Sequence, residues 1–304
     1  SSAASVRASA AGCSAISLRM RVDMARSSHP PVPQPSFGAG PSPMRATVSA
    51  DLVRLPPAPR LGCAYFGNRR PAHFRRDLAE MAAAGFDTVV HCVTEADVRW
   101  ERRAVERMLG DTRAAGLSCW ADPWGVAGAF EGEALHSGRP ARRVVPGWLA
   151  VVAAAGAEWV FWDEPRDLGP LPDWVGMAAG LGMRSSVCLA AIVTGLDPAP
   201  FRRVAAIPEV ADIGTDPYDL GQRAYSAAYP DRAAALVRGV ADAHGVGAHL
   251  WVQGFGLTDV RAQVAACRRH RLDGLFFWGF RGCEVQDFAA PASWDEVRHE
   301  MAGG

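Results

Sequence analysis

Two adjacent carboxylates, Asp163 and Glu164, follow a short apolar run and precede Pro165. An apolar run that ends in acids and a proline is typical of a buried strand that delivers acids to its C-terminal tip. Two neighbouring carboxylates repel, which raises the pKa of at least one of them and suits that group to act as a general acid. Because side chains alternate along a strand, only one of the two can continue an inward row unless the chain already turns at Pro165. A purely structural Asp-Glu-Pro turn is the alternative interpretation.

The combination of an acid, a proline and an aromatic residue recurs at two other strand ends, at Asp122 with Trp124 and at Asp216 with Tyr218. In the functional interpretation, Asp122 makes polar contacts to a substrate and Trp124 offers it a flat apolar face. In the structural alternative, the aspartate caps the next segment and the tryptophan plugs the mouth of the fold. Asp212 shares a strand face with Asp216, but Asp216 is nearer the tip and is the better functional candidate.

Other strand ends carry polar or aromatic residues that could contact a ligand. Asn68 could hydrogen-bond a ligand or cap the following helix. Gln253 can position a hydroxyl group but cannot act as a nucleophile or base. We expect Trp278 to form the floor of the site and Arg281 to pair with one of the acids. His91, inside an apolar strand, is expected to be a hydrogen-bonded core residue.

A regular alternation of strands and helices must position these residues. Apolar runs of strand length recur eight times, with helix-length segments rich in Ala, Arg, Glu and Leu between them. This alternation predicts parallel strands with right-handed crossovers, and eight units predict a (β/α)8 TIM barrel whose site forms where the strands end. The predicted strands are Leu61–Asn68, Phe86–Thr94, Leu117–Trp124, Trp159–Pro165, Arg184–Ala191, Val210–Tyr218, Gly247–Leu257 and Gly274–Gly282.

A doubly wound open sheet is the competing fold. No Gly-x-Gly-x-x-Gly fingerprint follows an early strand, and polar residues lie at nearly every strand end rather than at one switch point, so the barrel is favoured. Helices are predicted at Pro71–Ala84, Val98–Ala115, about Pro146 to Ala155, Tyr225–His244 and Thr258–Arg271.

Composition limits the possible functions. Residues 61–304 are about the usual size for one barrel, and the Ser-, Ala-, Pro- and Arg-rich residues 1–60 are predicted to be a disordered tail. The formal net charge of +0 and the pI of about 7.1 give no case for binding nucleic acid or an anionic membrane. The absence of lysine excludes mechanisms that need a lysine amine, such as Schiff-base aldolase and pyridoxal phosphate chemistry.

The 7 cysteines are odd in number and scattered, which indicates small buried hydrophobes in a reducing compartment. There is no recognisable signal peptide or membrane span, so a cytoplasmic location is expected.

Paired acids beside aromatic platforms suit carbohydrate chemistry, because one acid can protonate a glycosidic oxygen while sugar faces stack on indoles. The sequence here resembles the (β/α)8 glycoside hydrolases. The end of strand four, Asp163-Glu164-Pro165, is similar to the Asn-Glu-Pro ending of retaining members, whose Glu is acid/base, although those members carry a nucleophilic Glu where this chain has Gln253. The chain is also similar to α-galactosidase-type barrels, which implies Asp163 as nucleophile and Asp216 as acid/base.

The resulting hypothesis is a glycoside hydrolase or transglycosidase acting on a carbohydrate substrate without a cofactor or metal. Glu164 would be the general acid, and Asp163 or Asp216 the nucleophile or base. One alternative is a metal-dependent isomerase or epimerase that uses the acids with His91 or His249 as ligands. The other is a sugar-binding barrel without catalysis. The substrate contacts expected in the main hypothesis are Asp122, Trp124, Asn68, Tyr218, Gln253, Trp278 and Arg281.

Overall fold

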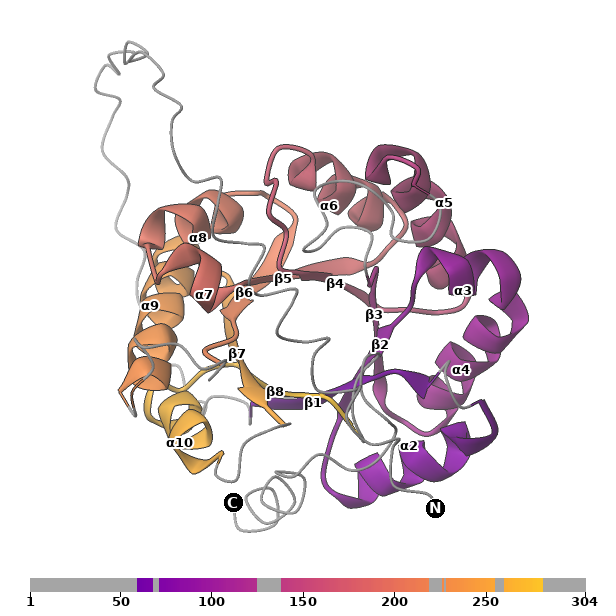
Figure 1. Cartoon of the computed structure of the whole chain (residues 1–304), viewed down its shortest axis with the longest axis horizontal. Helices are drawn as coiled ribbons and strands as arrows, with labels where there is room; N and C mark the ends of the chain where they lie inside the picture. Colours follow the sequence, from indigo (N-terminus) through magenta and orange to yellow (C-terminus); the bar gives the residue numbers. More distant parts are fainter. Residues whose placement is uncertain are drawn as a thin grey trace, which may run out of the picture. The chain divides into compact units, whose positions relative to one another are not determined.

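The computed structural model of the chain describes residues 59–67, 71–124, 138–218, 226, 228–254 and 260–280. Eight parallel strands close into a barrel in chain order, and helices surround them (Figure 1), so the predicted (β/α)8 TIM barrel is confirmed. The predicted tail lies outside the described residues apart from its last two. The strands are β1 (Arg60–Tyr65), β2 (Thr88–Cys92), β3 (Ser118–Asp122), β4 (Trp159–Asp163), β5 (Arg184–Leu189), β6 (Val210–Thr215), β7 (Gly247–Gln253) and β8 (Gly274–Trp278).

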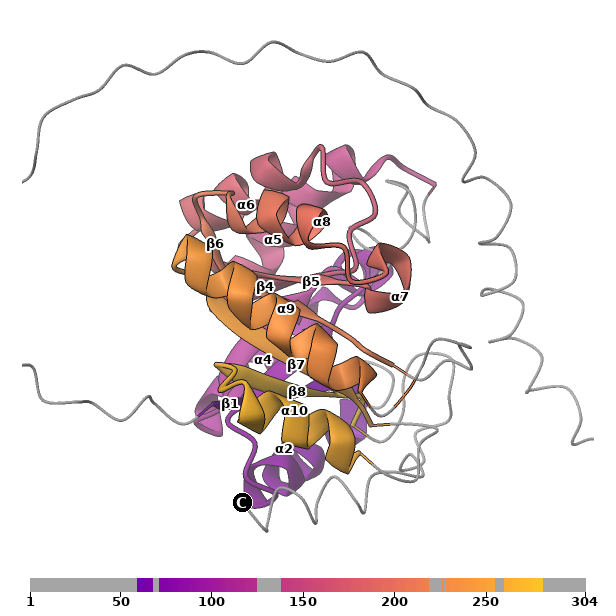
Figure 2. The ribbon, with the colours of Figure 1, turned by 90° about the vertical axis from the view of Figure 1, so that its left-hand side faces the viewer.

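The helices lie around the outside of the barrel, as the side view in Figure 2 also shows. Their buried apolar side chains belong to the same core cluster as the outward-facing residues of the strands. None of the helices in the described part of the chain has the length and apolarity needed to cross a bilayer. The helical segments are η2 (Pro71–His73), α2 (Phe74–Ala83), α3 (Glu95–Trp100), α4 (Arg102–Ala114), α5 (Ala141–Ala154), α6 (Leu171–Gly180), α7 (Ala191–Thr194), α8 (Pro198–Ala205), α9 (Tyr229–His244) and α10 (Arg261–Arg269).

Two helix predictions were wrong in detail. The segment after β2 forms two helices, α3 and α4, because Thr94 and Asp97 make a capping box that starts α3 upstream of the predicted position. Helix α5 begins at Ala141, and Pro146 lies inside it rather than at its start. The proline removes one backbone hydrogen bond, but the turn before it is held by buried apolar side chains, including Val145. Burial of that apolar face outweighs the proline's preference for a first turn.

Large side chains close the middle of the barrel. Trp120, Phe161, Trp251 and Phe276 point inward from β3, β4, β7 and β8, and their neighbouring ring centroids are 4.7 to 5.1 Å apart. Phe276 fits because the neighbouring strand β1 carries glycine at the paired position: a Cβ on Gly62 would lie 2.1 Å from Phe276 Cδ1. The centre is therefore a packed core, and polar side chains lie only above and below it.

The layer at the strands' N-terminal ends holds a buried ion cluster. His249 Nδ1 lies 3.2 Å from Asp212 Oδ1, both side chains are fully buried, and Arg60 contacts the other oxygen of Asp212. Burial alone would raise the pKa of Asp212, but the charges of His249 and Arg60 hold it well below its usual range. Gly214 leaves room for the imidazole, since a Cβ there would lie 2.0 Å from His249 Nε2. Asp212 is therefore a structural residue, separated by the aromatic layer from the strand tips.

Candidate active site at the carboxyl ends of the strands

Four carboxyl groups meet at the C-terminal end of the barrel. Asp122 and Asp163 are the last residues of β3 and β4, Glu164 follows β4, and Asp216 follows β6. The charge of Glu164 contributes to raising the pKa of each of the other three, which shows that the groups interact closely. The barrel thus brings together acids that are up to 94 positions apart in the sequence.

A left-handed backbone at Glu164 allows two consecutive acids to face the same site. Along β4, Trp159 and Phe161 point into the barrel, whereas Trp162 points outward and donates from Nε1 to Ser185 Oγ at 3.1 Å. Simple alternation would put Asp163 inside and Glu164 outside. At Glu164, however, φ is +43°, and the chain turns so that its carboxyl group hydrogen-bonds with Asp216. A left-handed non-glycine residue is strained, and such strain gathers at functional sites.

The environment of Asp216 raises the pKa of its carboxyl group well above the usual range. Burial raises its pKa most, followed by the charge of Glu164 and the hydrogen bond to Glu164. The backbone N–H of Ala191 opposes this shift by donating to Asp216 Oδ1 at 2.9 Å. Asp216 is therefore the member of this pair whose protonated form the surroundings favour.

Asp122 and Asp163 also have pKa values well above the usual range. Burial is the main cause for both. At Asp163 the charges of Asp122 and Glu164 raise the pKa further. At Asp122 the nearby Cys92 thiol lowers the pKa, but burial and the charge of Glu164 outweigh it. Asp122 is only 1% exposed, whereas Asp163 and Glu164 are half-buried. The two acids of β4 are thus the members of the group that a solute can reach most readily.

Sequence reasoning missed the contribution of β5. Cys188, near the end of this strand, lies among the carboxyl groups, and burial followed by the charge of Asp216 raises the pKa of its thiol. The thiol therefore stays neutral beside the acids. Side chains alternate along a strand, so Ser186 and Cys188 share one face of β5. This alternation would have placed Cys188 on the inward face. The Ala191 N–H could not be found in this way, because a backbone contact leaves no residue signature.

Aromatic rings form one wall of the site. The ring centroids of Phe66, Trp124 and Trp278 lie 5.2 to 5.7 Å from one another. Trp278 is 8% exposed and Trp124 is half-buried, so Trp124 offers the more accessible indole. Gly254 allows the β7 end to approach Trp278 closely, since a Cβ there would lie 2.8 Å from the Trp278 carbonyl oxygen. Trp124, predicted as a flat apolar face, and Trp278, predicted as the floor of the site, thus pack against each other.

The remaining predicted contacts are placed as follows. Tyr218 is half-buried at the mouth, and burial, then the charge of Asp216, raises the pKa of its hydroxyl. Gln253 is 3% exposed, and its backbone N–H donates to Gln263 Oε1 at 2.8 Å. Asn68 and Arg281 lie outside the described residues.

Neither candidate imidazole belongs to this site. His91 points out of the barrel and makes a 2.8 Å hydrogen bond to Thr112 of α4, which confirms its prediction as a core residue. His249 belongs to the ion cluster at the opposite end. Within the described ranges, no three His, Cys, Asp or Glu side chains are grouped so that they could hold a metal ion.

Comparisons with known proteins support the fold. No protein-family model matches the chain, and neither does any curated protein sequence. Among solved structures, the catalytic domain of a mannanase from Streptomyces sp. SirexAA-E has a TM-score of 0.57 at 15% identity, covering 78% of this chain and 83% of that one. A GH5_18 structure from Streptomyces cattleya in complex with GlcNAc has a TM-score of 0.54 at 16% identity, covering 80% of each chain.

D-psicose 3-epimerase, solved in the presence of D-fructose, has a TM-score of 0.52 at 14% identity and covers 80% of this chain and 97% of that one. Glycoside hydrolases and an enzyme of another class therefore share the architecture, and at such identities the likeness shows the fold alone. The chain is a (β/α)8 barrel of the kind found in glycoside hydrolases.

Proposed function

We propose that the protein is a glycoside hydrolase or transglycosidase, with the barrel from residue 61 onward as its catalytic domain. The observation that carries the proposal is the left-handed turn at Glu164, which adds a second acid from β4 to a group that already holds Asp122, Asp163 and Asp216. A strained backbone that gathers like charges has a cost in stability, and catalysis by paired carboxyl groups gives a reason to retain it.

The protonation states suggest the roles. Asp216, whose pKa is raised, would donate its proton to the glycosidic oxygen as the bond to the anomeric carbon breaks. Glu164 would then act as the carboxylate that attacks the anomeric carbon or activates water. This assignment exchanges the roles that the sequence suggested for Glu164 and Asp216, and it agrees with the resemblance that implied Asp216 as acid/base. Asp163 would hold a sugar hydroxyl beside the reacting bond.

The contact between Glu164 and Asp216 has a consequence for substrate entry. Carboxyl groups that flank a scissile bond are about 5–5.5 Å apart in retaining glycosidases and about 6.5–9.5 Å apart in inverting ones. Glu164 and Asp216 are close enough to hydrogen-bond in the free protein. We propose that the sugar enters between them and replaces this hydrogen bond with bonds to the substrate.

The aromatic wall supports a carbohydrate substrate. The half-buried indole of Trp124, backed by Phe66 and Trp278, offers a flat face beside the acids, and sugar rings pack their C–H faces on such surfaces. The metal-dependent alternative gains no support from the geometry, because His91 and His249 are both held elsewhere. Sugar binding without turnover remains an outcome that the experiment must separate from catalysis.

The experiment is a hydrolysis screen with 4-nitrophenyl glycosides and soluble polysaccharides, using the wild type, Glu164→Gln, Asp216→Asn and the control Asp173→Asn. Asp173 is an exposed acid in the first turn of α6. Each site variant should lower kcat at least 100-fold without a change in melting temperature that signals unfolding, while the control keeps full activity. Full activity of both site variants would refute the assignment, and sugar binding without turnover in the wild type would show a binding protein.

A further inference from the structure

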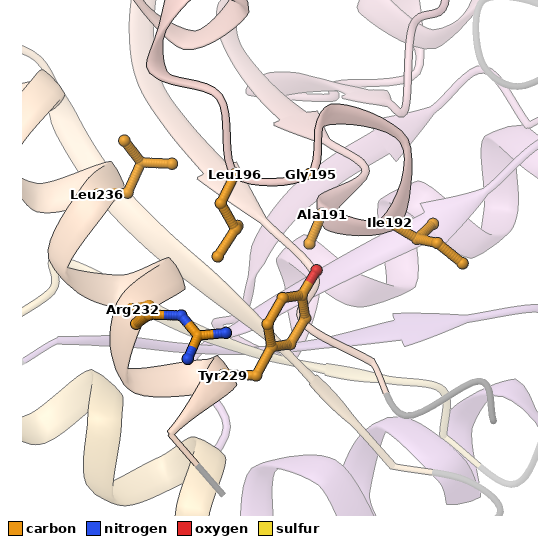
Figure 3. A pocket seen from close by; sticks show the side chains of 7 residues that line it. All are labelled: Ala191, Ile192, Gly195, Leu196, Tyr229, Arg232 and Leu236. Atoms are coloured by element: carbon orange, nitrogen blue, oxygen red, sulfur yellow. The ribbon is translucent and has the colours of Figure 1, made fainter. Parts of the chain in front are cut away.

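A pocket of about 520 Å³ lies between the segment after β5 and the first turns of α9 (Figure 3). This volume is within the range of about 300–1,000 Å³ that is usual for small-molecule sites. From α9 come Tyr229, Arg232 and Leu236, whose spacing puts them on one face of the helix. The segment after β5 contributes the opposite wall with Ala191, Ile192, Gly195 and Leu196.

One residue that lines the pocket contacts the carboxyl group of Asp216. Ala191 lines the pocket and also donates its backbone N–H to Asp216 Oδ1 at 2.9 Å. In Figure 3 the Tyr229 hydroxyl points toward Ala191, and the pKa of that hydroxyl is raised by burial and then by the charge of Asp216. A ligand in the pocket would therefore contact residues that interact with the proposed proton donor.

Among the described residues that line the pocket, Arg232 is the cation. Its guanidinium carbon lies 5.7 Å from the centroid of the Tyr229 ring, and the two side chains lie next to each other in Figure 3. Among the described residues no carboxylate forms an ion pair with Arg232. The adjacent acid, Asp231, is instead bound by His270, with its Nε2 at 3.0 Å, and by Arg269. Within the part of the chain that the structure describes, the positive charge of Arg232 is thus available to a ligand.

We propose that this pocket is a subsite for an acidic sugar, in which Arg232 binds the anionic group, carboxylate or phosphate, while Leu196 and Leu236 contact the apolar part of the ring. The inference rests on the proposed function for its place in catalysis, and it names the substrate class. Arginine presents paired N–H donors that match the oxygens of either anion. The ring of Tyr229 holds the guanidinium in place by a cation–π contact.

Binding is tested separately from turnover by isothermal titration calorimetry with D-glucuronate, D-glucose 6-phosphate and D-glucose. The wild type should bind one or both acidic sugars at least tenfold more tightly than D-glucose, and binding should weaken as salt is added. Arg232→Leu should lose at least tenfold in affinity for the acidic sugar and keep the weak affinity for glucose. Arg143→Leu, which removes an exposed arginine from α5, is the matched control and should bind like the wild type.

A second variant adds charge instead of removing it. Leu196 has φ of +62°, a left-handed conformation that aspartate tolerates better than leucine, so Leu196→Asp should fold and repel the acidic sugar. Equal binding of all three sugars, no binding of any, or unchanged binding by Arg232→Leu would overturn the proposal. Glu164→Gln should still bind the acidic sugar. The turnover of Glu164→Gln therefore tests the proposed function, and the binding of the acidic sugar tests the subsite.

Discussion

Replacing Glu164 with glycine should stabilise the protein while it abolishes activity. Glu164 adopts φ of +43°, a region that costs a non-glycine residue about 1–2 kcal/mol. Glycine adopts this conformation without strain. It also lowers the stability by about 0.5–1 kcal/mol, because glycine gives the unfolded chain more conformational freedom. The net gain from the backbone is therefore about 0.5–1 kcal/mol, which corresponds to a rise in melting temperature of about 1–4 °C for a domain of this size.

The comparison that isolates this gain is Glu164→Gly against Glu164→Gln. Both variants remove the negative charge that raises the pKa of the neighbouring aspartates, but only the glycine variant relieves the backbone. Arg271→Gly provides the matched control, because Arg271 is exposed and has φ of +50° away from the acids. It should gain a similar free energy of unfolding and keep full activity.

The assay is equilibrium unfolding in guanidinium chloride at pH 7, followed by tryptophan fluorescence, with thermal melts as a second measure. We expect Glu164→Gly to be more stable than Glu164→Gln by about 0.5–1 kcal/mol. A glycine variant that is equal to or less stable than the glutamine variant would refute the argument that Glu164 carries backbone strain. Retained hydrolysis in either variant would separately contradict its role at the site.

Three further predictions concern buried groups. Asp212→Asn should lower the free energy of unfolding by about 3–5 kcal/mol, because it removes the charge of the fully buried carboxylate that Arg60 and His249 contact, whereas Glu106→Gln in the exposed pair on α4 should change it by less than about 0.5 kcal/mol. The raised folded pKa of Asp216 gives stability that is fully present below about pH 3.9 and is lost as pH rises through the folded value. Melting curves from pH 4 to 8 should therefore show that the melting temperature of Asp216→Asn increases relative to that of the wild type as pH rises. A constant difference between the two melting temperatures would contradict the raised pKa. Burial lowers the pKa of His91 to about 3, so its contribution is present above about pH 6.5 and is lost as pH falls toward 3; nuclear magnetic resonance of the imidazole protons should show no protonation above pH 5.

Much of the fold was predictable because local patterns and tertiary packing agree. The run from Val160 to Trp162 is apolar on both faces, as a strand between a packed barrel interior and surrounding helices must be, and the structure confirms it as β4. The start of α5 was not predictable, because Pro146 signals a helix start and only the packing of Val145 against the core overrides it. Local propensity is a weak guide wherever burial contributes more free energy.

The candidate site also contains some residues that the local sequence predicts and others that it does not. Prolines and aromatic residues after Asp122 and Asp216 marked the tips of their strands in the sequence, so these acids could be named in advance. The contact of Cys188 with them could not be named, because alternation along β5 gives the face of this residue but not whether that face meets a core or an acid.

The eight strands, their parallel order and the acids at their ends follow from local patterns, since strand periodicity and strand-end residues are properties of short segments. The turn of Glu164 to the same side as Asp163 depends on the folded chain, because the alternation of a strand predicts the opposite. The tertiary structure also decided that Asp212 is structural while Asp216 is available for chemistry. The physical reason is that a carboxyl group's protonation depends on which charges and how much solvent surround it, and these neighbours come from distant parts of the chain.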